Sequence, residues 1–141
     1  MSFNKLEGKV ILSVGGCEKG SDRITIVCSD LTEFQLFHYQ GCCENVLVED
    51  VAGDPADLIG HRVALAEESV NRDNPPSEYS ESFTWTFYRI RTHGGDLTIR
   101  WLGESNGYYG ESVDVDVRQI PLESLSSESQ VLRDSLLERG L

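Results

Sequence analysis

Two alternating segments, residues 83–92 and 96–102, constrain the fold more than any other feature, because only a few residues separate them. Apolar and polar side chains alternate along both segments, which is the period of a β-strand. Gly94 and Gly95 stand between them, and two successive glycines are typical of a two-residue hairpin turn because both can adopt positive φ without steric cost. The sequence therefore predicts an antiparallel hairpin with its turn at Gly94-Gly95.

A turn at this position sets the pairing register along both strands. His93 pairs with Asp96, and every second residue then lies on the same face of the hairpin. One face is mostly apolar and is predicted to cover the core, and its pairs are Thr92 with Leu97, Ile90 with Ile99 and Tyr88 with Trp101.

The opposite face of the hairpin gathers arginine and aromatic side chains. In the predicted register Arg89 lies directly across from Arg100, and Arg91, Trp85 and Phe87 lie on the same face. Like charges in opposite positions destabilise a strand pair, so these arginines need negative partners. The chain's own carboxylates, those of a second subunit or a bound anion would each supply them. The guanidinium fork suits phosphate oxygens, and an aromatic ring beside it suits a stacked base.

Turn residues divide the rest of the chain into further strand-length segments, at residues 9–14, 23–28, 33–39, 44–51, 62–70 and 108–120. Asp54 followed by Pro55 has the cap pattern of a short helix over residues 55–59. Leucines at helical spacing predict an amphipathic C-terminal helix. We therefore expect the α+β class, with a mainly antiparallel ligand-binding domain over residues 1–121. The helix of residues 122–141 would dock on that domain or on a second subunit.

Two polar segments are predicted to be loops. Residues 71–82 hold two prolines and many small polar side chains, which favours an irregular connection. Residues 103–107 lead through an Asn-Gly turn at Asn106 to Tyr108 and Tyr109. Such a loop either closes over a ligand, by hydrogen bonds to ribose hydroxyls and by ring contacts, or is an ordinary turn whose tyrosines bridge core and water.

The formal net charge of -12, from 24 acidic and 12 basic residues, narrows the range of partners. Duplex DNA or RNA is not expected as a partner, because binding it through phosphates needs a broad basic surface. No apolar run approaches the length of a membrane span, and the first residues lack the pattern of a secretory signal. We therefore expect a cytosolic protein with no membrane partner.

An imidazole and two thiols lie close together in the sequence, at His38, Cys42 and Cys43. No CxxC pair occurs, and adjacent cysteines in a strand point to opposite faces, so only one of them would readily join His38 in a metal site. An even cysteine count in a cytosolic chain does not imply disulfides. A buried structural turn and a metal site both stay open. Because the common catalytic motifs are missing, we expect neither an enzyme nor a cofactor.

The strings FHYQGCCENVLVEDVAGD, DLIG, TWTFYRI and IRWLGESNGYYGESVD occur in this order between residues 37 and 114. Their combination resembles a family of small proteins encoded mainly by bacteriophages, and the architecture is similar to the first-described type of Thoeris anti-defence protein. The resemblance implies an oligomeric protein of the host cytoplasm, a sponge that sequesters cyclic ADP-ribose signals made by bacterial TIR-domain proteins without cleaving them. Some members also hold cyclic oligonucleotides.

On this hypothesis the arginines neutralise a pyrophosphate, an aromatic ring stacks on adenine and the loop residues contact ribose. The side chains assigned to this cyclic nucleotide are Arg89, Arg91, Arg100, Trp85, Phe87, Asn106, Tyr108 and Tyr109. Two other functions fit the sequence. One is an inhibitor that presents its acidic surface to a host defence enzyme. The other is a metal-stabilised structural protein that uses His38, Cys42 or Cys43.

Overall fold

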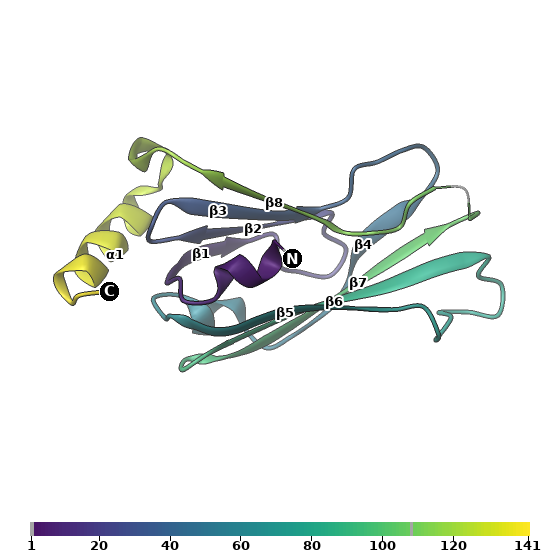
Figure 1. Cartoon of the computed structure of the whole chain (residues 1–141), viewed down its shortest axis with the longest axis horizontal. Helices are drawn as coiled ribbons and strands as arrows, with labels where there is room; N and C mark the ends of the chain where they lie inside the picture. Colours follow the sequence, from purple (N-terminus) through teal and green to yellow (C-terminus); the bar gives the residue numbers. More distant parts are fainter. Residues whose placement is uncertain (1, 108) are drawn as a thin grey trace.

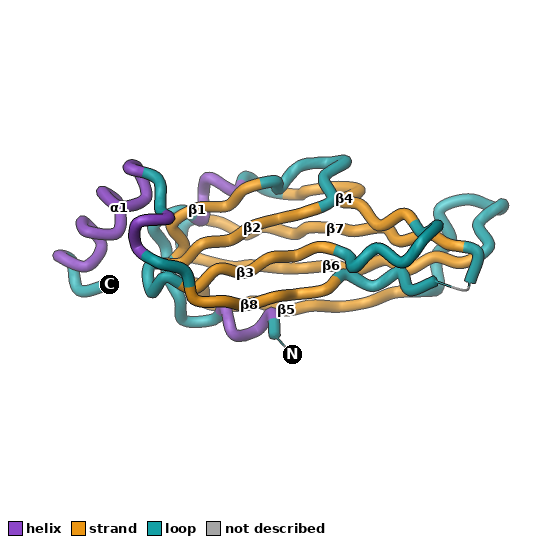
Figure 2. The backbone as a smooth tube through the Cα atoms, turned by 90° about the horizontal axis from the view of Figure 1, so that it is seen from above, coloured by secondary structure: helices purple, strands orange, loops and turns teal. Residues whose placement is uncertain are grey.

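The structure, a computed structural model, describes residues 2–107 and 109–141, and this part of the chain forms two antiparallel sheets packed face to face (Figure 1). The strands are β1 (Ile11–Gly15), β2 (Arg23–Cys28), β3 (Thr32–Phe37), β4 (Asn45–Ala52), β5 (Val63–Asn71), β6 (Ser82–Thr92), β7 (Gly95–Ser105) and β8 (Asp114–Gln119). Their order is β1-β2-β3-β8 in the first sheet and β4-β7-β6-β5 in the second. Figure 2 shows the strands of both layers running along the length of the molecule.

The expectation of a mainly antiparallel sheet is confirmed. The fold is more strongly β than the predicted α+β class, since the described residues contain one α-helix, α1 (Ser127–Glu138). The other helical elements are short 3-10 turns, η1 (Phe3–Leu6), η2 (Pro55–Leu58) and η3 (Leu122–Ser124).

Inward-facing side chains of both sheets form the main core. Tyr88, Ile90, Ile99 and Trp101 of the hairpin are fully buried, as the alternation of its residues predicts. The first sheet contributes Ile24, Ile26, Phe34 and Leu36. Burying one such large apolar side chain stabilises the fold by about 1.5–3 kcal/mol. Each strand buries one of its two faces against the other sheet, and the sequence therefore alternates between apolar and polar residues.

The hairpin of β6 and β7 forms, but its register differs from the predicted one. Thr92 pairs with Gly95 instead of Leu97, a displacement of two residues, and the turn residues are His93 and Gly94. Because side chains alternate with a period of two, every residue keeps its predicted face. The displacement changes only which residues lie opposite one another.

The predicted opposition of two arginines is therefore wrong. Arg89 pairs with Thr98, and Arg100 pairs with Phe87. Arg89 and Arg100 are therefore not directly opposite each other, and this pair no longer gives a reason to expect a bound anion.

Local packing explains the position of the turn. The Thr92 hydroxyl oxygen accepts hydrogen bonds from the N–H groups of Gly94 (3.0 Å) and Gly95 (3.2 Å). Neither glycine has the positive φ that the sequence analysis expected. Gly94 is needed for space instead, because a Cβ there would collide with the Asp57 carbonyl and the His61 ring.

The predicted helices occur with shorter bounds. The Asp54 carboxylate accepts a hydrogen bond from the Ala56 N–H (3.0 Å), which starts η2 at the predicted place. The C-terminal helix begins later than predicted, at Ser127, because the hydroxyl of Ser126 caps it by accepting from the Ser129 N–H (3.1 Å).

Two strand boundaries near residue 108 also differ from the predicted ones. β7 runs through Gly103 to Ser105, where a loop was predicted, and β8 begins only at Asp114, although a strand was predicted from residue 108. A buried hydroxyl network holds the connection between them, as described below.

Helix α1 lies at one end of the sandwich, and the two loops that carry the HYQGCCE and GESNGYYGES strings, called the motif loops, lie at the other (Figure 1). At the helix end a second apolar cluster contains Val10, Leu12, Val27, Ile120, Leu125 and Leu136. The other end carries the connections between β3 and β4, β5 and β6, and β7 and β8. Within the described residues, no helix has both the length and the apolar character needed to cross a membrane.

Candidate functional site

Five side chains on the solvent side of the second sheet form the outer arginine face: Trp85, Phe87, Arg89 and Arg91 of β6, with Arg100 of β7. Their common face agrees with the predicted alternation. A hollow of about 310 Å³ opens here beside Phe87 and Arg89.

Carboxylates of the same chain neutralise this face. Arg89 Nη1 lies 3.7 Å from Glu67 Oε1 on β5, and Arg91 Nε lies 3.3 Å from Asp96 Oδ1 across the hairpin. All four side chains are about half exposed, so each pair contributes only about 0–1 kcal/mol to stability. Of the compensations that the sequence left open, pairing with the chain's own acidic residues is confirmed.

Arg100 is held more closely than the other two arginines. Its Nε donates to Glu49 Oε2 at 2.7 Å, and its Nη2 also reaches Glu49, with Asp50 at 4.0 Å. Its guanidinium carbon lies 5.2 Å from the centre of the Trp85 ring, and the Trp85 N–H donates to the Asn74 carbonyl (2.6 Å). One face of the tryptophan predicted to stack a base is thus covered by the protein's own arginine.

The predicted ligand residues do not converge on one point. Arg91 lies at the turn end of the hairpin, whereas Asn106 and Tyr109 follow the other end of β7. From Arg100 to Ser105 the extended strand spans roughly 17 Å. Tyr108 lies outside the described residues. A single small molecule therefore does not reach all of the described residues assigned to it.

The loop between β7 and β8 is built around a buried carboxylate. Glu111 accepts hydrogen bonds from the hydroxyls of Thr84 (3.0 Å) and Ser105 (2.6 Å). The Ser105 oxygen in turn accepts from the Gly107 N–H at 3.0 Å. Ser105 and Glu111 of the GESNGYYGES string therefore have a structural role, in addition to the ligand contacts predicted for this loop.

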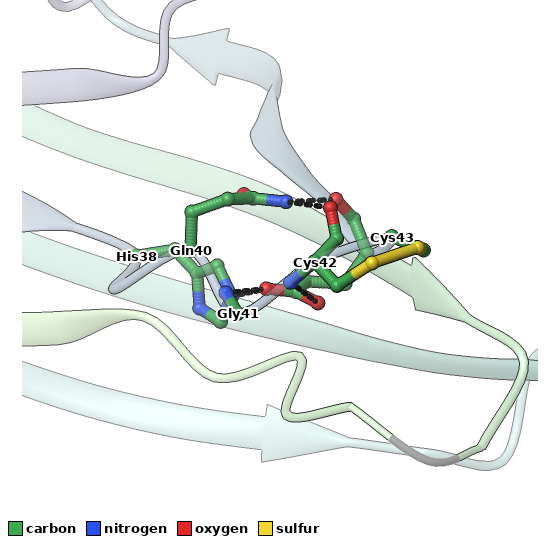
Figure 3. The surroundings of a disulfide bond; sticks show 6 residues. His38, Gln40, Gly41, Cys42 and Cys43 are labelled. Atoms are coloured by element: carbon green, nitrogen blue, oxygen red, sulfur yellow. Dashed lines mark hydrogen bonds and ion pairs between the residues drawn. A yellow bond between two sulfur atoms is a disulfide. The ribbon is translucent and has the colours of Figure 1, made fainter.

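A second buried carboxylate organises the loop between β3 and β4 (Figure 3). Glu44 accepts from the Gly41 N–H, from the Cys42 N–H (3.2 Å) and from His38 Nε2 (3.0 Å). The Gln40 amide donates to the carbonyls of Glu44 (2.7 Å) and Cys42 (3.2 Å). The HYQGCCE string therefore encodes a closed hydrogen-bonded loop.

The donors around Glu44 stabilise its charged form. The Gly41 N–H is the main cause that brings the pKa of the Glu44 carboxyl down to about 2; burial opposes this shift, and His38 and the Cys42 N–H add to it. Both His38 ring nitrogens face oxygen acceptors, Glu44 and the Ser112 carbonyl (2.7 Å). These two contacts hold the His38 ring between the Glu44 carboxylate and the Ser112 carbonyl.

The two motif loops meet at this end of the sandwich. The hydrogen bond from His38 to the Ser112 carbonyl joins the HYQGCCE loop to the GESNGYYGES loop. The Tyr109 ring lies beside Gly41, close enough that a Cβ on this glycine would touch it at 3.5 Å. His38 and Ser112, which are 74 residues apart in the sequence, thus join the two loops into one surface.

A cavity of about 390 Å³, the end hollow, lies beside the HYQGCCE loop and is lined by Asp22 and Arg23, by Phe37, His38 and Gln40, and by residues 44–47. Arg23 and Phe37 are cross-strand partners on β2 and β3. The Arg23 guanidinium carbon lies 4.3 Å from the centre of the Phe37 ring, and Tyr39 packs edge-on against that ring with the two centres 4.6 Å apart.

Arg23 differs from the arginines of the outer face in its partner. Its guanidinium donates to the neutral Gln35 amide oxygen, and no carboxylate lies within ion-pairing distance of it in residues 2–107 and 109–141. Nearby carboxylates are engaged elsewhere: Asp114 and Asp116 accept from the Tyr39 N–H (2.9 Å) and hydroxyl (3.0 Å). The hollow thus contains an exposed cation on an aromatic ring, and its lining also includes two acidic residues, Asp22 and Glu44, of which Glu44 is held by the loop network.

The two adjacent cysteines are joined by a disulfide, Cys42–Cys43, in an exposed part of the same loop. The strand geometry assumed in the sequence analysis does not apply, since both cysteines lie in a loop, and the expected buried turn is exposed at these two residues. His38 and Glu44 are the buried members. In the part of the chain that the structure describes, no three histidine, cysteine or acidic side chains are arranged to hold a metal ion.

Comparison with known proteins assigns a family. The family described as a domain of unknown function, DUF7448, matches residues 4–115, which is most of the chain. The chain belongs to this family. No curated protein and no solved structure matches the chain.

Arg23 and Phe37 were not predicted as ligand contacts from the sequence, and no role was predicted for Glu44. The HYQGCCE string was a usable signal, because it placed an imidazole, an amide and a carboxylate within seven residues. No local pattern connects Arg23 to that string; only the pairing of β2 with β3 does.

Proposed function

We propose that this protein is a non-catalytic binding protein that sequesters a nucleotide-like anion, and that the end hollow is where it binds. With the resemblance to phage-encoded sponges, the ligand class is a cyclic nucleotide immune signal such as a cyclic ADP-ribose isomer, and the setting is phage anti-defence in the host cytoplasm. The outer arginine face, whose cations already have carboxylate partners, is not the primary anion site in this proposal.

The observation that carries the proposal is the state of Arg23. Its guanidinium lies over an aromatic ring and has a neutral amide as its hydrogen-bond partner. Because no carboxylate of the described residues forms an ion pair with it, a bound phosphate would not have to displace one. Arginine is well suited to this because its planar fork binds phosphate oxygens in pairs.

The other side chains at the hollow suit the remaining parts of a nucleotide. Tyr39 does not line the hollow itself, but it packs against Phe37, which does, and its ring is 63% exposed, so a base that extends beyond the hollow can stack on it. Asn45, exposed at the start of β4, offers a donor and an acceptor to a base edge or to ribose hydroxyls. The Glu44 network fixes the neighbouring loop, so binding would not require that loop to become ordered.

A second subunit would complete the site. The end hollow is open to solvent, and an exposed ion pair contributes at most about 1 kcal/mol. Excluding water by covering the hollow strengthens the charged interaction, so we propose that a homo-oligomer encloses the ligand between subunits.

Retention and release of ligand test this function. Purified protein is incubated with cyclic ADP-ribose isomers and, separately, with cyclic oligonucleotides, then filtered, heat-denatured and analysed by chromatography. We expect intact ligand in the released fraction. Recovery of a cleaved product would identify an enzyme instead. Absence of any retained nucleotide would refute sequestration and leave inhibition of a host enzyme through the acidic surface as the next hypothesis.

A further inference from the structure

The four cysteines differ in their exposure to solvent, and none of them has a role in the function proposed above. Cys42 and Cys43 are exposed, whereas Cys28 is fully buried and Cys17 is partly buried. Burial raises the pKa of the Cys17 thiol to about 11 and that of the Cys28 thiol to about 12. Since the thiolate is the reactive form of cysteine, these two are poor nucleophiles near neutral pH.

The exposed pair is mounted on a framework that does not depend on the sulfur atoms. Glu44, His38 and the Gly41 N–H hold one side of the loop, and the Gln40 amide reaches the Glu44 carbonyl. The side chain of Glu44 is 1% exposed and that of His38 is 7% exposed. Figure 3 shows the two bonded sulfurs pointing away from this hydrogen-bonded side.

We propose that Cys42–Cys43 is a site of reversible modification by small thiols, at which thiol–disulfide exchange opens and closes the bond between the two cysteines. Two features carry this inference: the sulfurs are accessible, and each cysteine has the other as its immediate neighbour. A solvent-accessible cysteine beside a second one that can displace an attached thiol is the arrangement found in redox-sensitive sites.

The exchange balances with a small monothiol as the reductant. A thiolate RS⁻ attacks one sulfur of the pair, an RS–S bond forms, the Cys42–Cys43 bond breaks and the other cysteine leaves as a thiolate. A second RS⁻ then attacks the sulfur of the attached group and releases RSSR and the second cysteine thiolate. Two thiols are oxidised to one disulfide, and the protein disulfide is reduced to two thiols. A small dithiol performs both steps within one molecule.

Opening the bond has a local structural consequence. The disulfide closes a small ring that contains the peptide bond between the two cysteines, so it restricts the backbone there. The Cys42 N–H donates to Glu44 and the Cys42 carbonyl accepts from Gln40. We expect reduction to loosen these two hydrogen bonds and to leave the hydrogen bond between His38 and Glu44 in place. This effect does not depend on any ligand at the end hollow.

Alkylation of the folded wild-type protein tests the site. Without reductant, we expect no iodoacetamide adduct on Cys42 or Cys43. After treatment with dithiothreitol under native conditions and its removal, we expect one adduct on each, located by peptide mass spectrometry, while Cys17 and Cys28 stay unmodified until denaturant is added. Labelling of the pair without reductant, or reduction only in denaturant, would overturn the proposal.

Amide hydrogen exchange tests the structural consequence separately. We expect faster exchange at the Cys42 N–H after reduction, and an unchanged rate at the Gly94 N–H, whose Thr92 partner lies in the distant hairpin turn. A C42S/C43S double variant should show the faster rate with or without reductant. Equal rates at Cys42 in the oxidised and reduced protein would overturn the coupling to the loop.

Discussion

The outer arginine face and the end hollow both place an arginine beside an aromatic ring, yet they differ in what neutralises the cation. Arg100 lies 5.2 Å from the Trp85 ring centre and Arg23 lies 4.3 Å from that of Phe37. Arg100 also contacts two carboxylates on β4, whereas Arg23 is hydrogen-bonded to the amide of Gln35.

An arginine cluster therefore indicates an anion site only when its neighbours on adjacent strands are known. On the outer face the flanking strands β4 and β5 supply glutamates at the positions beside Arg100 and Arg89. At the end hollow the corresponding neighbour is neutral. A cation without a carboxylate partner among the described residues gains more from a phosphate than one that must first give up its own partner.

The largest effect is expected from removing Arg23. In the oligomer proposed above, where a second subunit covers the hollow, Arg23→Ala should weaken nucleotide retention by roughly tenfold to a hundredfold, because a hydrogen bond to a charged group contributes about 1.5–3 kcal/mol. Arg89→Ala is the matched control on the outer arginine face and should change retention less than about threefold. Equilibrium binding of the retained ligand measures both. The opposite ranking of the two variants would move the site to the outer face.

An intermediate effect is expected from lowering the pH, which should reduce the free energy of unfolding by protonating Glu44. Its pKa in the folded protein is about 2, below the ordinary value of 4.5. The stability it contributes is therefore fully present above about pH 4.5 and is lost as the pH falls toward 2. Urea unfolding across this interval should show a steeper loss for the wild type than for Glu44→Gln.

The exposed Glu67 of the outer arginine face provides the control for acidification. Glu67→Gln should keep the pH dependence of the wild type, because it removes a carboxylate that is half exposed and has a single arginine partner. A wild-type slope in Glu44→Gln would show that the loop network does not hold the charged carboxylate as described.

The smallest effect is expected within the outer arginine face itself. A double-mutant cycle with Arg100→Ala and Glu49→Ala should give a coupling energy of about 0.2–1 kcal/mol, since both side chains are partly exposed. The same cycle for Arg89 and Glu67, whose atoms lie 3.7 Å apart, should give the lower end of that range. A coupling energy well above this range for either pair would mean that the face is more enclosed in solution, as in an oligomer.

Much of the fold could be predicted because the signals are local. Alternation identified the hairpin strands and their buried face, with Tyr88 and Trp101 in the core. Asp54 and Pro55 identified the short helical turn. The hairpin register could not be predicted in the same way, since it depends on the Thr92 side chain and on the close approach of Asp57 and His61 to Gly94.

The candidate site was predictable only in part. The sequence singled out the two loops that carry the HYQGCCE and GESNGYYGES strings, and it placed the arginines of β6 and β7 on one face. It did not show that Glu67, Asp96 and Glu49 neutralise those arginines. Two of these three carboxylates belong to other strands, so their positions depend on pairing between segments far apart in the chain.

The positions of most strands and turns, and the apolar side of each strand, follow from the order of the residues, because those properties depend on residues within a few positions of one another. Which strands are neighbours is visible only in the folded protein, and with it the contacts of His38 with Ser112 and of Arg23 with the Phe37 ring. The reason is physical: burial of an apolar face is satisfied by many registers and neighbours, whereas a hydrogen bond or a charge pair is satisfied only by particular atoms within about 3–4 Å.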